Sequence, residues 1–215
     1  MTELPDGTLL MCFHVVWKDG RELVSGSNNR HGAYVLRSRD GGETWGDASQ
    51  LSDNNLGETA LLYVPSGKLI ALLRQQPGDT ALWQMDSSDQ GYTWSEPRRV
   101  TGPRQHPGDL LRLADGRILL TFGHRRVPFG VRALVSHDDG QTWDHQHAIT
   151  LAAESLSADC GYPSSIQLDD GMIVTVYYVA RSLGPFHEPS LNERDLMGPY
   201  AAAIKYSAAD LPHAG

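Results

Sequence analysis

The chain carries the octapeptide Ser38-Arg39-Asp40-Gly41-Gly42-Glu43-Thr44-Trp45, and the same pattern, S-x-D-x-G-x-T-W, returns at 87–94 and at 136–143. Successive copies start 49 residues apart. Shared positions at a constant period indicate a repeat architecture. In each copy we expect Asp to accept backbone N–H groups inside a tight turn, Gly to adopt the left-handed conformation, and Trp to pack beneath the turn.

A second repeated element, a Gly-containing turn followed by an apolar run, accompanies the octapeptides. Its copies are Asp6-Gly7, Ser66-Gly67, Asp115-Gly116 and Asp170-Gly171. Gly accepts positive φ at little cost, so a turn of this type between apolar runs predicts a β-hairpin. Buried strands are expected directly after the turns, over 69–73, 118–122 and 172–178.

No segment shows a convincing helical period, so we predict an all-β protein with about four repeat units. One small antiparallel sheet cannot bury both of its faces alone. Stacking several such sheets radially solves this problem, which predicts a β-propeller. Given the length of 215 residues, we predict that residues 1–215 form a single domain.

Composition narrows the class of protein. A hydrophobic content of 40% and a charged content of 20% fit a soluble globular chain. No apolar run approaches the roughly 18 residues of a membrane span, so none is predicted. The formal charge of −8 argues against nucleic acid as a partner.

Positive charge is nevertheless concentrated in one part of the chain. The window from Arg98 to Arg132 contains eight arginines and two acids, a net +6, so the remainder carries −14. This window could form a solvated basic face. It could equally line a pocket for an anionic small molecule.

Cysteine and metal-ligand chemistry are sparse. Cys12 and Cys160 are too few for a disulfide framework, and we expect buried free thiols. The pair in Asp144-His145-Gln146-His147 has no third ligand in sequence, so no metal site is predicted. Phosphate- and dinucleotide-binding motifs are absent from the sequence, and no cofactor is predicted.

The octapeptides resemble the Asp box, the repeat of the sialidase (neuraminidase) superfamily, whose fold is a six-bladed β-propeller. The resemblance covers nearly the whole chain, with Asp boxes at 38–45, 87–94 and 136–143. It implies an exo-glycoside hydrolase that cleaves terminal sialic-acid-type sugars. The implied partner is therefore an anionic sugar or glycoconjugate.

The resemblance also implies site residues. Glu58 and Arg74 flank one turn-and-strand unit, similar in order and spacing to a glutamate–arginine pair of sialidases. Arg126, with Arg125 as second choice, precedes a late Asp box as a family arginine does. Tyr162 precedes a late Asp-Gly turn and matches the tyrosine nucleophile of the family. The closing stretch 202–206 resembles the last strand of the family.

These residue types suit the implied chemistry. Arginine binds carboxylates bidentately, so Arg74 and Arg126 would hold the sugar carboxylate. A neutral tyrosine nucleophile avoids repulsion by that carboxylate. A phenol with a pKa of about 10 needs a base, and Glu58 is the candidate, which gives a retaining mechanism. The structural alternatives are a strand-edge aromatic for Tyr162, a partly exposed ion pair for Glu58 and Arg74, and a loop arginine for Arg126.

Three further residues are candidates for the rim of the substrate site. His106 and Asp109 belong to His106-Pro107-Gly108-Asp109, which starts the third unit and could instead form a turn. Asp159 lies three residues before Tyr162 and could be a pocket acid or a loop cap.

Two features depart from the family pattern. The first arginine of the family would fall before Met1, so the chain resembles an N-terminally incomplete member, and with no signal peptide visible its compartment is left open. The family's acid/base aspartate should lie near 25–31, which contains no acid. Asp19 and Glu22 are the nearest acids, and His31 could donate the proton instead.

The missing acid leaves two other functions open. A catalytically impaired propeller that binds glycans would keep the arginines without the proton donor. Another carbohydrate-active Asp-box propeller would use the same repeats for a different sugar.

Overall fold

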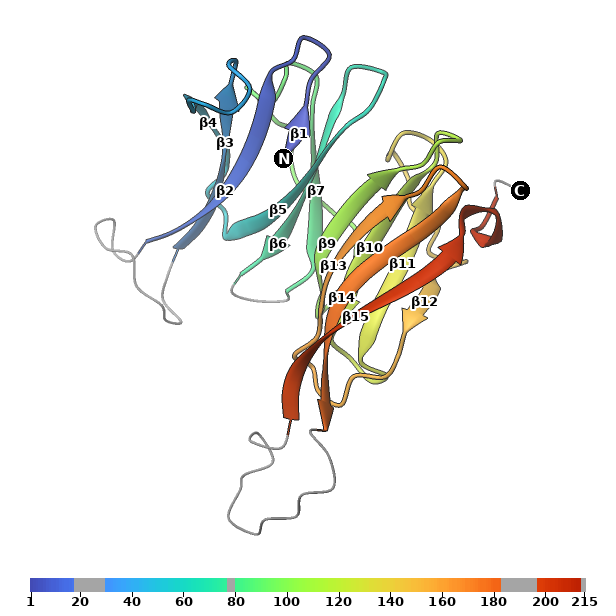
Figure 1. Ribbon diagram of the computed structural model, residues 1–215. Helices are drawn as coiled ribbons and strands as arrows, with labels where there is room; N and C mark the ends of the chain where they lie inside the picture. Colours follow the sequence, from blue (N-terminus) through green and yellow to red (C-terminus); the bar gives the residue numbers. More distant parts are fainter. Residues whose placement is uncertain (18–29, 77–79, 183–196, 214–215) are drawn as a thin grey trace. The chain divides into compact units, whose positions relative to one another are not determined.

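The computed structural model describes residues 1–17, 30–76, 80–182 and 197–213 (Figure 1). Within these residues the chain forms fifteen β-strands and one short 3-10 helix, Ala208–Asp210, so the prediction of an all-β protein is confirmed. The chain divides into two compact units, Met1–Pro103 and Arg104–Gly215. The single domain expected over 1–215 stays a prediction.

The first unit contains two antiparallel sheets whose strands follow one another in sequence order. One sheet consists of β1 (Thr2–Glu3), β2 (Leu9–Trp17), β3 (Arg30–Ser38) and β4 (Gly46–Ser52). The other consists of β5 (Leu56–Tyr63), β6 (Leu69–Gln75), β7 (Leu82–Ser87) and β8 (Arg98–Arg99). Strand β5 packs against β2 and β3.

The second unit repeats this plan. Its four-stranded sheet consists of β9 (Gln105–Arg112), β10 (Ile118–His124), β11 (Gly130–Ser136) and β12 (Ile149–Ala152). Its three-stranded sheet consists of β13 (Gly161–Gln167), β14 (Met172–Ser182) and β15 (Met197–Ser207). Strand β13 packs against β9 and β10. The described residues thus form four sheets, as the four repeat units predict.

The two repeated sequence elements occupy fixed places in the sheets. Each Gly-containing turn joins the first strand of a sheet to the second, and each octapeptide joins the third strand to the fourth. The box at 87–94 shows the expected bonding. Asp89 accepts hydrogen bonds from the backbone N and the hydroxyl of Thr93, at 2.9 and 2.6 Å. Gly91 has φ 84°, and Trp94 Nε1 donates to its carbonyl at 3.1 Å.

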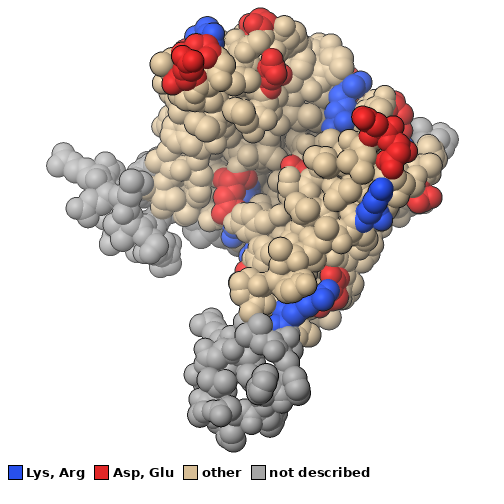
Figure 2. Space-filling model, in the orientation of Figure 1, with Lys and Arg blue, Asp and Glu red and all other residues tan. Residues whose placement is uncertain are grey.

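Side-chain contacts link the first two boxes. Arg37 is buried and donates to the backbone oxygens of Asp47 and Gln90, at 2.7 and 2.9 Å. Its guanidinium lies 3.8 Å from the centre of the Tyr92 ring, a cation–π contact. Arg39 forms an exposed ion pair with Asp47 at 2.8 Å. Figure 2 shows side chains of both charges together at this tip, over the β3–β4 turn.

Each unit has its own apolar core. In the first unit one cluster joins β2, β3 and β5 to β7 through Leu10, Val35, Leu56, Leu73 and Met85. In the second unit, one cluster joins β10 to β14 through Leu119 and Ile173, and another joins β11 to β14 through Val131 and Tyr177. Burial of these side chains stabilises the stacking of the sheets within each unit, at about 1.5–3 kcal/mol for each fully buried large apolar side chain.

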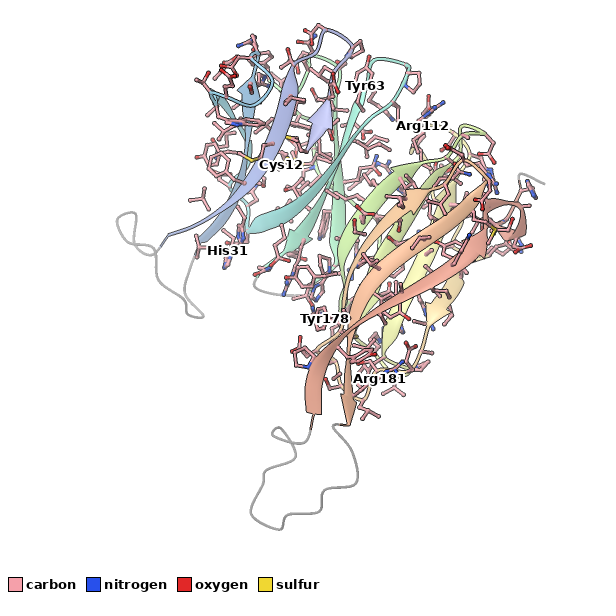
Figure 3. All side chains as sticks on the ribbon, in the orientation of Figure 1. Cys12, His31, Tyr63, Arg112, Tyr178 and Arg181 are labelled. Atoms are coloured by element: carbon pink, nitrogen blue, oxygen red, sulfur yellow. The ribbon has the colours of Figure 1, made fainter. Side chains whose placement is uncertain are left out.

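The two ends of the sheets differ within each unit. The repeated turns and boxes lie at one end, close to Tyr63 in the first unit and Arg112 in the second (Figure 3). His31 in the first unit and Tyr178 in the second each lie at the end away from these turns and boxes (Figure 3). Within each unit, most of the candidate site residues are found at this second end, where β5, β9 and β13 begin.

Candidate active site

The backbone is irregular near the starts of β5, β9 and β13. Register shifts occur between Gly57 and Thr59 in β5, opposite β9 at Phe122–His124, and between Gly161 and Ser164 in β13. Glu58 has φ 38° and Tyr162 has φ 48°. Left-handed backbone at a residue other than Gly costs about 1–3 kcal/mol and is concentrated at functional sites. A bulge also redirects the side chain it carries.

Glu58 and Arg74 form the ion pair that the sequence allowed as an alternative. Arg74 Nη1 donates to both carboxylate oxygens of Glu58, at 3.0 and 2.8 Å. The side chains of Arg74 and Glu58 are 16% and 26% exposed, so the pair is largely shielded from water. Gln76 Nε2 donates to Glu58 Oε1 at 3.0 Å. These bonds hold the carboxylate in place. The positive charge of Arg74 is paired with the negative charge of Glu58.

Two histidines lie beside this ion pair. His14 on β2 and His31 on β3 have ring centroids 5.0 Å apart, and His14 Nε2 lies 2.9 Å from His31 Nδ1. A Cβ atom on Gly57 would stand 2.3 Å from the His14 ring. Gly57 is therefore required for β5 to approach His14, and this contact places the histidine against the residue that precedes Glu58.

Tyr162 lies in a polar cluster of the second unit. Its side chain is half exposed, at 48%. The Tyr178 ring lies 6.0 Å away, and the Arg125 guanidinium lies 5.7 Å from the centre of the Tyr162 ring. Arg125 Nη2 donates to the Tyr178 hydroxyl at 3.3 Å, and that hydroxyl donates to Asp159. The cluster thus unites a tyrosine, an arginine and an acid that the sequence predicted separately.

The phenol of Tyr178 is a weak acid in this cluster. Burial, followed by its hydrogen bond to Asp159, raises the pKa of Tyr178 to about 12. The hydroxyl therefore stays protonated and acts as a hydrogen-bond donor at neutral pH. Because Asp159 accepts this bond, it acts as more than a loop cap.

The two arginine candidates have different surroundings. Arg125 is half-buried beside Tyr162, whereas Arg126 is exposed in the β10–β11 connection. Of the two candidates, Arg125 has its guanidinium by the tyrosine ring. Arg126 still acts at a distance. Burial, then Arg132 and Arg126, lower the pKa of His124 to about 4, so this end of the unit has a positive potential.

His106 and Asp109 lie in strand β9, so the interpretation of this segment as a turn is wrong. His106 is buried, and its carbonyl faces Gly123. Asp109 Oδ2 accepts a hydrogen bond from the backbone N of Ser165 at 2.8 Å. Asp109 therefore links β9 to β13 inside the second unit.

Within the described ranges there is no group of three or more His, Cys, Asp or Glu side chains that could hold a metal ion. His147 and Asp144 form an ion pair at 2.7 Å. The two acids Asp19 and Glu22, and most of the stretch 25–31, lie outside the described residues.

Sequence reasoning missed three participants: His14, Gln76 and the hydrogen bonding of Tyr178. The repeat pattern carried a signal for one of them, because the hairpin register aligns Tyr178 with Gly161, next to Tyr162. No sequence signal connects His14 with Gly57, since their contact joins strands of different sheets.

A family model described as a BNR repeat-like domain matches residues 1–175. The chain belongs to this family. The match confirms the Asp-box repeats and the likeness to the sialidase superfamily. No curated protein matches the sequence. In the described residues, no helix has the length and apolar character that a membrane span needs.

Solved structures of similar BNR-type architecture come from several organisms. A protein of unknown function from Dyadobacter fermentans is 25% identical, with a TM-score of 0.76, over 95% of this chain and 52% of that one. The Penicillium chrysogenum α-L-arabinanase is 17% identical, with a TM-score of 0.63, over 94% and 60%. The Trypanosoma rangeli sialidase is 15% identical, with a TM-score of 0.54, over 82% and 28%.

These likenesses confirm the β-propeller fold class of the BNR chain. The chain spans less than two thirds of the length of each of these structures. The activities named for the arabinanase and the sialidase belong to those proteins.

Proposed function

We propose that this BNR protein is a retaining exo-glycoside hydrolase that acts on anionic, sialic-acid-type sugars, with Tyr162 as nucleophile and Glu58 as its base. The cluster around Tyr162 carries this proposal. Its phenol is half exposed on a left-handed bulge, with an arginine over the ring and a second tyrosine held by an acid. Such a constellation has strain, charge and a nucleophile in one place.

The reaction would proceed in two displacements. In the first, Glu58 accepts the phenolic proton and the Tyr162 oxygen bonds to the anomeric carbon, while the glycosidic oxygen leaves with its electron pair and takes up a proton. In the second, water attacks the anomeric carbon and releases the sugar, and Tyr162 recovers its proton. Two inversions give net retention.

The positive potential near Tyr162 supports an anionic substrate. Arg125 stands at the ring. At the same end of the unit, burial, then Arg132 and Arg126, lower the pKa of His124 to about 4. A sugar carboxylate would be attracted here, whereas a carboxylate nucleophile would be repelled by it. Arg125 and Arg126 are the proposed contacts of the sugar carboxylate. Arg74 is proposed to contribute partly by holding the Glu58 carboxylate in place.

A second candidate follows from the structural likenesses. The arabinanase has a higher TM-score than the sialidase, which favours a neutral pentoside as an alternative substrate. The two candidates differ in one physical respect, because a pentoside offers no carboxylate to Arg125 and Arg126. Their relative turnover therefore reports on the role of these arginines.

The decisive experiment compares a fluorogenic sialoside with an aryl α-L-arabinofuranoside. We expect turnover of the sialoside and a loss of about 10³-fold or more in kcat for Tyr162→Phe, because the variant has no nucleophilic oxygen. Tyr200→Phe is the matched control. Tyr200 on β15 is similarly exposed, at 54%, and its ring lies under the guanidinium of Arg181 on β14.

Each other result has a distinct meaning. Turnover of the arabinoside alone would establish the second candidate. Equal activity of wild type and Tyr162→Phe would show that another group is the nucleophile. Binding of sialic acid by a folded protein without turnover would identify a glycan-binding propeller.

A further inference from the structure

We infer that Tyr178 is a positioning residue that separates Arg125 from Asp159, and that it thereby keeps the guanidinium available to an anionic ligand. This inference rests on the proposed function, in which Arg125 contacts the sugar carboxylate. It gives a role in substrate specificity to a tyrosine other than the proposed nucleophile. All the residues that carry it belong to the second unit.

Strand pairing fixes the place of Tyr178. It lies on β14, opposite Gly161 of β13 on one side and Ala201 of β15 on the other. A central strand that is hydrogen-bonded on both sides cannot shift alone. The Tyr178 ring lies 6.0 Å from the Tyr162 ring. Its hydroxyl is therefore held at a fixed position beside the proposed nucleophile.

A buried thiol brings an acid and an arginine to the same place. Cys160 is buried, and its Sγ lies 3.9 Å from the carbonyl oxygen of His124. Asp159 precedes this cysteine in the chain, and Arg125 follows this histidine. The backbone N of Arg125 also donates to the carbonyl of Arg104 at 2.9 Å. The two segments thus lie side by side, so the opposite charges that they carry attract one another.

The phenol of Tyr178 stands between these two charges. Arg125 Nη2 donates to the Tyr178 hydroxyl at 3.3 Å, and the hydroxyl donates its proton to Asp159. Among the residues that the structure describes, Arg125 and Asp159 form no direct ion pair. Because the pKa of Tyr178 is raised to about 12, the phenol keeps its proton at neutral pH and the arrangement persists.

This separation leaves Arg125 with donors and charge for a ligand. A guanidinium presents several N–H donors in a rigid fork. Within the described ranges the Arg125 side chain makes one hydrogen bond, to Tyr178. A direct bidentate pair with Asp159 would engage further donors and neutralise the charge. The phenol prevents this, while the guanidinium stays 5.7 Å from the centre of the Tyr162 ring.

The neighbouring tyrosine on β14 provides a matched control. Tyr177 precedes Tyr178, so its side chain points to the other face of the sheet. Its hydroxyl donates to Glu154 at 2.9 Å, and burial, then this hydrogen bond, raise its pKa to about 12. Tyr177→Phe therefore removes an equivalent hydroxyl from the same strand without touching the contact of Arg125.

The test compares the binding of sialic acid with that of its methyl ester, which has no negative charge. Calorimetric titration gives the ratio of the two dissociation constants. For Tyr178→Phe we expect the preference for the acid to fall by about 10-fold, because Arg125 pairs directly with Asp159. In the double variant Tyr178→Phe/Asp159→Asn the preference should return to the wild-type value or above, since the acid is gone. Tyr177→Phe should keep the wild-type ratio.

A second measurement needs no sugar. Phenylglyoxal modifies arginine side chains, and peptide mass spectrometry gives the rate at each position. Arg125 should react more slowly in Tyr178→Phe than in the wild type, because the direct pair with Asp159 shields it. The double variant should restore the rate. Arg126, which is exposed, is the internal reference.

Equal weakening of acid and ester in Tyr178→Phe would overturn the inference and leave Tyr178 a structural residue. A double variant with the same low preference as Tyr178→Phe would overturn it as well, since Asp159 would then not compete for Arg125. If the wild type binds neither ligand, the proposed function is wrong. The labelling still decides the role of Tyr178 in that case, and an unchanged rate at Arg125 in Tyr178→Phe would refute it.

Discussion

At the scale of single residues, burial moves two acidic groups of the second unit away from their usual titration range. Burial raises the pKa of Asp109 to about 6, against the opposing hydrogen bond from the backbone of Ser165. Burial, and then the hydrogen bond to Asp159, raises the pKa of Tyr178. The first shift couples protonation to folding, and the second keeps a donor available beside Tyr162.

Asp109→Asn tests the first coupling. The folded protein retains the Asp109 proton up to about pH 6, whereas the unfolded chain releases it near 3.8. The folded state thus binds more protons between these values, so the stability contributed by this group falls as the pH rises through them. Asn keeps an oxygen for the Ser165 N–H but does not ionise.

We therefore expect the melting temperature of Asp109→Asn to exceed that of the wild type at pH 7. The difference should vanish below about pH 4, where Asp109 is protonated in both states. Thermal melts of both proteins across this range measure it. A constant difference at all pH values would contradict the raised pKa.

At the scale of elements, strands of different sheets meet where glycines allow it. A Cβ on Gly123 of β10 would stand 2.5 Å from the backbone oxygen of His106 and 3.2 Å from Gly161 Cα. A Cβ on Gly161 would stand 2.7 Å from Gly123 Cα. This close approach aligns the starts of β9 and β13, and therefore sets the position of Tyr162.

Gly123→Ala should destabilise the second unit by about 1–3 kcal/mol, because the obstructing atoms belong to the backbone and cannot rotate away. Chemical denaturation measures the change. Gly46→Ala is the control, since a Cβ on Gly46 meets no atom within 4 Å, and we expect it to be nearly neutral. Equal stability of the two variants would show that β10 and β13 are not in close contact in solution.

At the scale of the whole molecule, the two thiols report on the two compact units. Cys12 lies in the first unit and Cys160 in the second, and both are free cysteines. Burial raises the pKa of Cys12 to about 12 and raises the pKa of Cys160 above its usual value. Both thiols should therefore react slowly with alkylating reagents in the folded protein.

Thiol labelling in increasing denaturant, resolved by peptide mass spectrometry, tests the prediction of a single domain over 1–215. If the chain unfolds cooperatively, both cysteines become reactive at the same denaturant concentration. Separate midpoints would show that the units Met1–Pro103 and Arg104–Gly215 unfold independently.

The repeats could be predicted from sequence because their interactions are local. Asp89, Thr93 and Trp94 complete their hydrogen bonds within the octapeptide or one turn of it, so the residue types suffice to specify the turn. The same holds for the Gly-containing turns and the strands that follow them. Glu58, Arg74, Arg125 and Tyr162 were found through a family resemblance.

Non-local register determines the rest. The left-handed backbone of Glu58 and Tyr162 and the His14–His31 contact depend on the register between paired strands, and the place of Arg125 over Tyr162 depends on packing between two sheets. A shift of one residue would turn these side chains to the opposite face of their sheets. Packing within each unit selects one register, and for that reason the histidine pair emerged only once the chain was folded.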